Sequence, residues 1–182
     1  MARLPHLTLD DLPPDQRTRV EVAARPMRDV KRLFPELLHS PEVAARYLDL
    51  TNYFREASIL TLHTREIVTL ATAREWNSQY IWTEHEEAAR RAGVSDEIIF
   101  AIRDRKELNG LPPNDAAFIR YAQELLKNRK VTDATFHAIE DLAGARGVVE
   151  LTILIGYYTM QVHTVAALEV ELRDGVTPLL PV

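Results

Sequence analysis

The stretch Glu66–His85, EIVTLATAREWNSQYIWTEH, decides how the fold of this chain is interpreted. Apolar residues recur at helical spacing on both sides of Asn77 and Ser78, which are poor residues inside a helix and good caps. The stretch therefore predicts two consecutive helices with a break at Asn77-Ser78. Spacing of three and four residues places Ser78, Trp82 and His85 on one face of the second helix.

The remainder of the chain shows the same period, and no segment predicts a strand. Gly93 suits the residue after the second helix of the central stretch, and Ser95 can cap the next one. The sequence therefore predicts an all-α bundle of seven or eight helices. They are expected at 27 to about 38, from 41 onward, 65–76, 78–92, 95–105, 114–128, 132–143 and about 146–172.

The N-terminal residues 1–25 differ from this pattern, because Pro5, Pro13 and Pro14 fall among charged residues. Proline breaks a helix when it falls inside one. We expect residues 1–25 to form an extended arm with at most one short turn of helix. Residues 26–182 are then expected to form a single all-α domain.

Composition excludes several classes of function. The 182 residues are 46% hydrophobic, enough for a substantial core, and carry a net charge of −5 without a clustered basic face. A nucleic-acid binder normally has such a face, so none is expected. The chain has no cysteine, which excludes structural disulfides, thiolate metal sites and thiol-based redox chemistry.

The location of the protein is predicted from two segments. The N-terminus, MARLPHLTLDDLPPD, lacks an apolar core long enough for a signal peptide. The longest apolar region, Val148–Val170, contains Glu150, Gln161 and His163, which is more typical of a buried or interfacial helix than of a membrane span. We expect a cytoplasmic protein without a membrane partner.

The candidate catalytic residues are His85 and Glu66. A histidine backed by a carboxylate can move a proton near neutral pH. If Glu66 is buried beside His85, it orients the imidazole and raises its proton affinity. The alternatives are a packed core histidine and a glutamate that only complements the dipole at the start of its helix.

Three nearby residues are candidates to bind a substrate. Tyr80 and Trp82 could line a pocket or belong to the core. Ser78 is explained most simply as a helix cap, since seven residues of helix separate it from His85 by about 10 Å. The helix start at Ser78 could nevertheless offer N–H groups to a substrate carboxylate. Arg74 is a further candidate for binding such a carboxylate. No metal site is predicted, because no second histidine stands one turn from His85.

The central region resembles the carboxymuconolactone decarboxylase family, which includes the alkylhydroperoxidase D branch. The residues that carry the resemblance are L-x-x-R-E-x-V-x-L-A-x-A, followed by N-S-x-Y-x-W-x-x-H-x-x-x-A-x-x-A-G-V-S-x-E-x-I, within residues 62–101. The resemblance implies an all-α, alkylhydroperoxidase D-like fold. It also implies assembly of intertwined subunits, usually as trimers or hexamers.

The redox branch of that family has a glutamate, then C-x-x-C, then a histidine four residues after the second cysteine. The glutamate and histidine fall on Glu66 and His85, whereas the cysteine positions fall on Ser78 and Ile81. Glu66 and His85, the two ends of the family's proton relay, are present, but the cysteine pair between them is absent. Peroxidase or disulfide-reductase chemistry by this mechanism is therefore excluded. A peroxiredoxin-like label can still be attached to the family as a whole.

What the resemblance implies instead is a cofactor-free lyase that decarboxylates a small organic acid or lactone, with His85 and Glu66 handling the proton. Isomerisation or lactone hydrolysis by the same residues stays open. A non-catalytic oligomeric scaffold or ligand-binding relative is the alternative of a different class. An enclosed polar pocket with Glu66 and His85 in contact would favour the enzyme, and close apolar packing around His85 would favour the scaffold.

Overall fold

The computed structural model describes residues 3–25, 33–172 and 175–181, and every regular element in these ranges is helical. This confirms the all-α prediction. The chain divides into two compact units, the first formed by residues 1–58 and 165–171 and the second by residues 59–164 and 172–182. The predicted division into an arm (1–25) and one domain (26–182) stays a prediction, and the residues at its boundary, 26–32, lie outside the described ranges.

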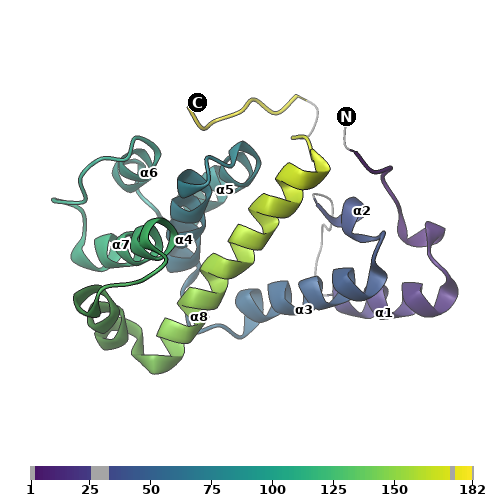
Figure 1. Cartoon of the computed structure of the whole chain (residues 1–182), viewed down its shortest axis with the longest axis horizontal. Coiled ribbons are helices and arrows are strands. Elements are labelled where there is room, and N and C mark those ends of the chain that lie inside the picture. Colours follow the sequence, from purple (N-terminus) through teal and green to yellow (C-terminus); the bar gives the residue numbers. More distant parts are fainter. Residues whose placement is uncertain (1–2, 26–32, 173–174, 182) are drawn as a thin grey trace. The chain divides into compact units, whose positions relative to one another are not determined.

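In the first unit, the described helices are a short 3-10 helix and three α-helices (Figure 1): η1 (Leu9–Asp11), α1 (Pro14–Ala24), α2 (Phe34–Leu37) and α3 (Pro41–Glu56). Helices α1 and α3 pack against each other. The buried core of this unit consists of Leu12, Val20, Ala23, Phe34, Leu38, Ala44, Ala45 and Leu48.

The N-terminal segment contains more helix than predicted. Helix α1 runs for 11 residues, where at most one short turn was expected. The physical reason is the position of Pro14, which is the first residue of α1. A proline there loses no intrahelical hydrogen bond, because the first N–H groups of a helix have no partner, and its φ already suits the helix. Val20 and Ala23 then bury one side of α1.

The second unit contains the central stretch. Its helices are α4 (Leu62–Glu75), α5 (Gln79–Arg91), α6 (Asp96–Arg103), α7 (Pro113–Asn128) and most of α8 (Asp133–Leu168). Helix α4 packs against α5, α6 and α7 (Figure 1). Its residues from Glu66 to Ala73 are all buried, so it is the core helix of this unit.

The boundaries of α4 and α5 follow from their caps. The predicted break at Asn77-Ser78 is confirmed: Asn77 has a left-handed φ of 50°, and the Ser78 side chain accepts a hydrogen bond from the N–H of Ile81. The start of α4 was predicted about one turn too late, at residue 65 with Thr64 as the preceding cap position. Thr61 is the N-cap instead, and its hydroxyl accepts a hydrogen bond from the N–H of Thr64. Either threonine is an acceptable cap residue, and only the structure distinguishes them.

Helix α8 contains the predicted interruption between residues 143 and 146. Gly144 has φ 68° and ψ 175°, so the helix is broken there. It is also the one helix in the described residues that is long and apolar enough to cross a membrane by length and composition. Within it, Glu150 is buried and accepts hydrogen bonds from Arg146 and from the backbone N–H of Ile59. A buried charged residue with such partners is typical of a helix packed against protein.

Candidate active site

The candidate site is built by the pairing of α4 with α5. Glu66 lies in the second turn of α4 and His85 in the middle of α5. The break at Asn77-Ser78 reverses the chain, so two residues 19 positions apart face each other. His85 Nδ1 lies 2.8 Å from Glu66 Oε2. The two residues named from the sequence as catalytic are therefore brought into direct contact.

The burial of this pair and its hydrogen bond determine which nitrogen of His85 carries the proton. The side chains of His85 and Glu66 are only 11% and 10% exposed. An ionised carboxylate can only accept a hydrogen bond, so Nδ1 of the neutral imidazole carries the proton and Nε2 keeps its lone pair. Among the described residues, no protein group makes a hydrogen bond to Nε2. The arrangement can therefore take a proton at Nε2, or give one from it, while Glu66 holds the ring.

The ring of His85 also packs against Tyr158 of α8. The centroids of the two rings lie 5.1 Å apart with planes at 85°, and Tyr158 makes a similar edge contact with Tyr157. Tyr158 was not predicted from the sequence as a site residue. The available signal was the Tyr157-Tyr158 pair in a long apolar helix, but nothing in the sequence indicates which helix that pair faces.

The predicted substrate-binding residues have different surroundings. Trp82 is completely buried, and its Nε1–H donates to Glu86 Oε2, so protein surrounds it on every side. Tyr80 is also buried. Ser78 caps α5, with its hydroxyl 3.4 Å from the N–H of Ile81. A substrate-binding role for these three residues stays a prediction.

Arg74, the candidate residue for binding a substrate carboxylate, makes hydrogen bonds within the protein. Its Nε–H donates to the backbone carbonyl of Arg103 at 2.6 Å, and its guanidinium also donates to Asn77. Burial lowers the pKa of Arg74, and the positive charge of Arg105 lowers it further. These contacts join the C-terminal end of α4 to that of α6, where free helix carbonyls favour a cation.

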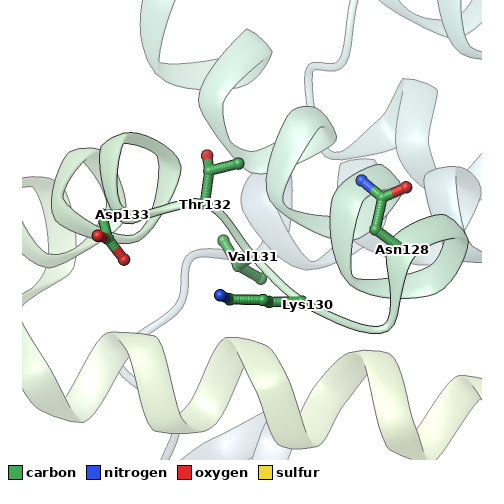
Figure 2. A pocket seen from close by; sticks show the side chains of 5 residues that line it. All are labelled: Asn128, Lys130, Val131, Thr132 and Asp133. Atoms are coloured by element: carbon green, nitrogen blue, oxygen red, sulfur yellow. The ribbon is translucent and has the colours of Figure 1, made fainter.

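A separate pocket of about 330 Å³ lies where α7 joins α8. Figure 2 shows the side chains that line it, all from one continuous segment: Asn128, Lys130, Val131, Thr132 and Asp133. None of the predicted site residues belongs to this set. In the described part of the chain, no group of three or more His, Cys, Asp or Glu side chains is arranged to hold a metal ion.

Comparison with known proteins gives two findings. Residues 41–124 match the model of the carboxymuconolactone decarboxylase family. A solved structure described as an alkylhydroperoxidase AhpD core, an uncharacterized peroxidase-related protein from Ralstonia eutropha, superposes with a TM-score of 0.76. The two chains are 19% identical, and the match covers 98% of each. No curated protein matches the chain in sequence.

At 19% identity, the structural likeness shows the fold alone, and it confirms the predicted alkylhydroperoxidase D-like architecture. The family match spans α3 to most of α7 and includes Glu66, the Ser78 and Ile81 positions, and His85. The resemblance seen in the sequence is thereby confirmed. The chain thus has an alkylhydroperoxidase D-like fold, contains no cysteine, and matches the carboxymuconolactone decarboxylase family model over residues 41–124.

Proposed function

We propose that this chain is a cofactor-free enzyme that transfers a proton on a small organic acid or lactone, with decarboxylation as the reaction. His85 is the proton donor and acceptor, and Glu66 orients it. The observation that carries the proposal is the 2.8 Å contact between His85 Nδ1 and Glu66 Oε2 in a largely buried position. A histidine held by a buried carboxylate is a recurring device for directed proton transfer.

The chemistry requires only groups that this chain and its substrate supply. Loss of CO₂ from the substrate carboxylate leaves an electron pair on carbon, and a conjugated carbonyl of the substrate takes it up as an enolate. His85, protonated at Nε2, then gives that proton to the carbon. Glu66 stabilises the imidazolium before the transfer and fixes the tautomer after it. One proton from solvent restores the pair after each turnover.

The surroundings of the pair support this reaction. Tyr158 packs on the imidazole ring, and the buried residues of α4 shield Glu66 from bulk water. A carboxylate loses CO₂ more readily in an environment that solvates its charge poorly. Isomerisation or lactone hydrolysis would use the same pair. We further propose a cytoplasmic homo-oligomer, a trimer or hexamer, with Tyr80 and Trp82 supporting the site from within the core.

The test is an assay of carboxylated lactones that contain a conjugated carbonyl, incubated with the protein in D₂O. NMR follows the release of CO₂ and the appearance of deuterium on the former carboxyl-bearing carbon. We expect turnover by the native protein and a loss of at least about 100-fold in His85→Asn, the range assigned to a general acid or base. His137→Asn is the matched control, because His137 also pairs with a carboxylate, that of Glu140, but is exposed.

Equal rates in the native protein and in His85→Asn would refute the assignment. Binding of the lactones without any release of CO₂ or uptake of deuterium would favour the alternative, a ligand-binding or scaffold relative. Circular dichroism of each variant verifies that the helical fold is retained.

A further inference from the structure

A second histidine–carboxylate pair lies one helical turn from the first. His63 Nε2 is 3.1 Å from Asp115 Oδ1. His63 is the second residue of α4, and Asp115 lies in the first turn of α7, so the pair joins the starts of two helices that pack together. The sequence places these residues 52 positions apart, and the motif that carries the family resemblance specifies neither of them.

The position of His63 on α4 relates the two pairs. His63 and Glu66 are three residues apart in one helix, which places their Cβ atoms about 5–6 Å from each other. One neighbour of α4 is α5, which supplies His85, and another is α7, which supplies Asp115. The four side chains therefore form a row across the first two turns of α4, in the order Asp115, His63, Glu66 and His85.

Exposure differs between the two ends of this row. His85 and Glu66 are 11% and 10% exposed, whereas His63 is 31% exposed and Asp115 15%. The inner pair is sheltered from solvent and the outer pair is accessible to it. His63 is therefore the more accessible of the two histidines.

We propose that His63 and Asp115 form a second ionisable pair, coupled electrostatically to Glu66–His85, that adjusts the proton affinity of His85. The effect on turnover rests on the proposed function, while the coupling itself is a property of the fold. In each cycle His85 gives one proton from Nε2 to the substrate carbon and regains one at Nε2 from solvent. The negative charge of Asp115 favours the protonated form of His85, and a positive charge on His63 opposes it.

The coupling has a defined sign for each variant. With His63→Asn, the charge of Asp115 is no longer offset, so the proton affinity of His85 rises. With Asp115→Asn, the negative charge is removed and His63 remains, so the proton affinity of His85 falls. Because Glu66 lies between the outer pair and His85, the charges are on the order of 10 Å apart, and at that separation they shift such an affinity by roughly threefold to tenfold.

Other charged or titratable groups surround the two pairs, and both variants leave them in place. They lie on α4 and on the helices packed against it or against His85: Arg65 on α4; Glu84, Glu86 and Arg90 on α5; Asp96 and Arg103 on α6; Arg120, Tyr121, Glu124 and Lys127 on α7; and Tyr157 and Tyr158 on α8. Because these groups are common to every variant, a difference between variants reports the His63–Asp115 pair.

The experiment is an NMR titration of the histidine ring nitrogens in ¹⁵N-labelled full-length protein, without any ligand. We expect the midpoint of His85 to rise by about half to one pH unit in His63→Asn and to fall in Asp115→Asn. His137→Asn should leave it unchanged, since His137 lies on an exposed part of α8.

An unchanged His85 midpoint in both variants would overturn the proposal. The His63–Asp115 contact would then only stabilise the packing of α4 against α7. Shifts of the same sign in the two variants would also overturn it. If the His63→Asn variant does not fold, the proposal is tested by Asp115→Asn alone, in which the His85 midpoint should be lower than in the native protein. The two hypotheses fail separately: shifts without lactone turnover would remove the proposed function only, and turnover without shifts would remove this coupling only.

Discussion

Among single residues, Glu66 has the most specific task in the proposed mechanism, because its contact with His85 determines which ring nitrogen keeps a lone pair. Its carboxylate accepts from Nδ1 and thereby directs the lone pair to Nε2. A neutral amide in the same place can present either its oxygen or its NH₂ group to the ring. Orientation of the imidazole and stabilisation of its charged form are then both weakened.

We therefore predict that Glu66→Gln lowers kcat/KM for a carboxylated lactone by about 10-fold to 100-fold while the protein stays folded. Steady-state assays of the two proteins measure this loss. The control is Glu140→Gln, which removes the carboxylate beside the exposed His137 instead. Full activity in Glu66→Gln would show that the carboxylate has no part in the reaction.

The residues of the site differ in how far the sequence reveals them. Glu66, Ser78 and His85 belong to one local motif, whose residue types predicted the helix break. The contact between Glu66 and His85 was stated from the sequence only as a condition, and the structure shows it. Tyr158 and the His63–Asp115 pair depend on how α8 and α7 pack against the rest of the unit. Such long-range contacts leave no periodic signal in a single sequence.

Among the elements, α8 depends on two glycines near its break. Gly144 adopts φ 68°, and this turn brings Ala143 so close that a Cβ added at Gly147 would lie 2.2 Å from the Cβ of Ala143. At Gly156, further along the same helix, nothing lies within 4 Å of an added Cβ. The two glycines thus offer a matched comparison.

We predict that Gly147→Ala lowers the free energy of unfolding by about 1–3 kcal/mol, because the backbone must shift to remove the overlap. Gly156→Ala should be neutral or stabilising by up to about 1 kcal/mol, since alanine favours the helix. Chemical denaturation of both variants decides this point, and equal stabilities would contradict the geometry at the break.

The connection between α7 and α8 is held by Glu124. Its carboxylate accepts hydrogen bonds from the N–H and hydroxyl of Thr132 and from the hydroxyl of Thr135. Burial raises the pKa of Glu124, but these hydrogen bonds outweigh burial, with a contribution from Arg120, and hold the pKa below its ordinary value. The carboxylate therefore stabilises the fold above the pKa of an unfolded glutamate, about 4.3. That stability is lost as the pH falls through the lower, folded value.

We predict that Glu124→Gln costs about 1–2 kcal/mol of unfolding free energy at pH 7 and progressively less below about pH 4. Urea denaturation of the native protein and the variant over this pH range measures the difference. A cost that does not change with pH would mean that the charge of Glu124 is irrelevant to this connection.

Prediction of elements succeeded where local chemistry was decisive. Ser78, Ser95 and the break before residue 146 were identified from residue types alone. The prediction of an extended arm at residues 1–25 underestimated its helix content, because each proline was taken as a helix breaker whether or not it stood at a helix start. Pro14 begins α1, and the burial of Val20 and Ala23 then stabilises that helix.

For the whole molecule, the outer face of α8 suggests how copies assemble. One side of this helix is buried, with Leu151, Leu154 and Ile155 in the core. The other side exposes large apolar residues at helical spacing: Val149, Ile153 and Met160. An exposed apolar stripe of this kind is typical of an interface, which agrees with the oligomer that we propose.

We predict that Ile153→Asp dissociates this oligomer, because a charge in an apolar interface is costly to bury. Sedimentation of the native protein and the variant at micromolar concentration measures the effect. Gln123→Asp is a control that adds the same charge on a different helix, α7. A native protein that is already monomeric would remove the predicted trimer or hexamer.

The central claim is that Glu66 holds His85 with its proton on Nδ1 and its lone pair on Nε2. The ¹⁵N chemical shifts of the His85 ring, measured in the neutral state, report this tautomer directly. We predict a protonated Nδ1 and an unprotonated Nε2 in the native protein, and a mixture of tautomers in Glu66→Gln. A proton on Nε2 of the native His85, or the same mixture in both proteins, would contradict the account.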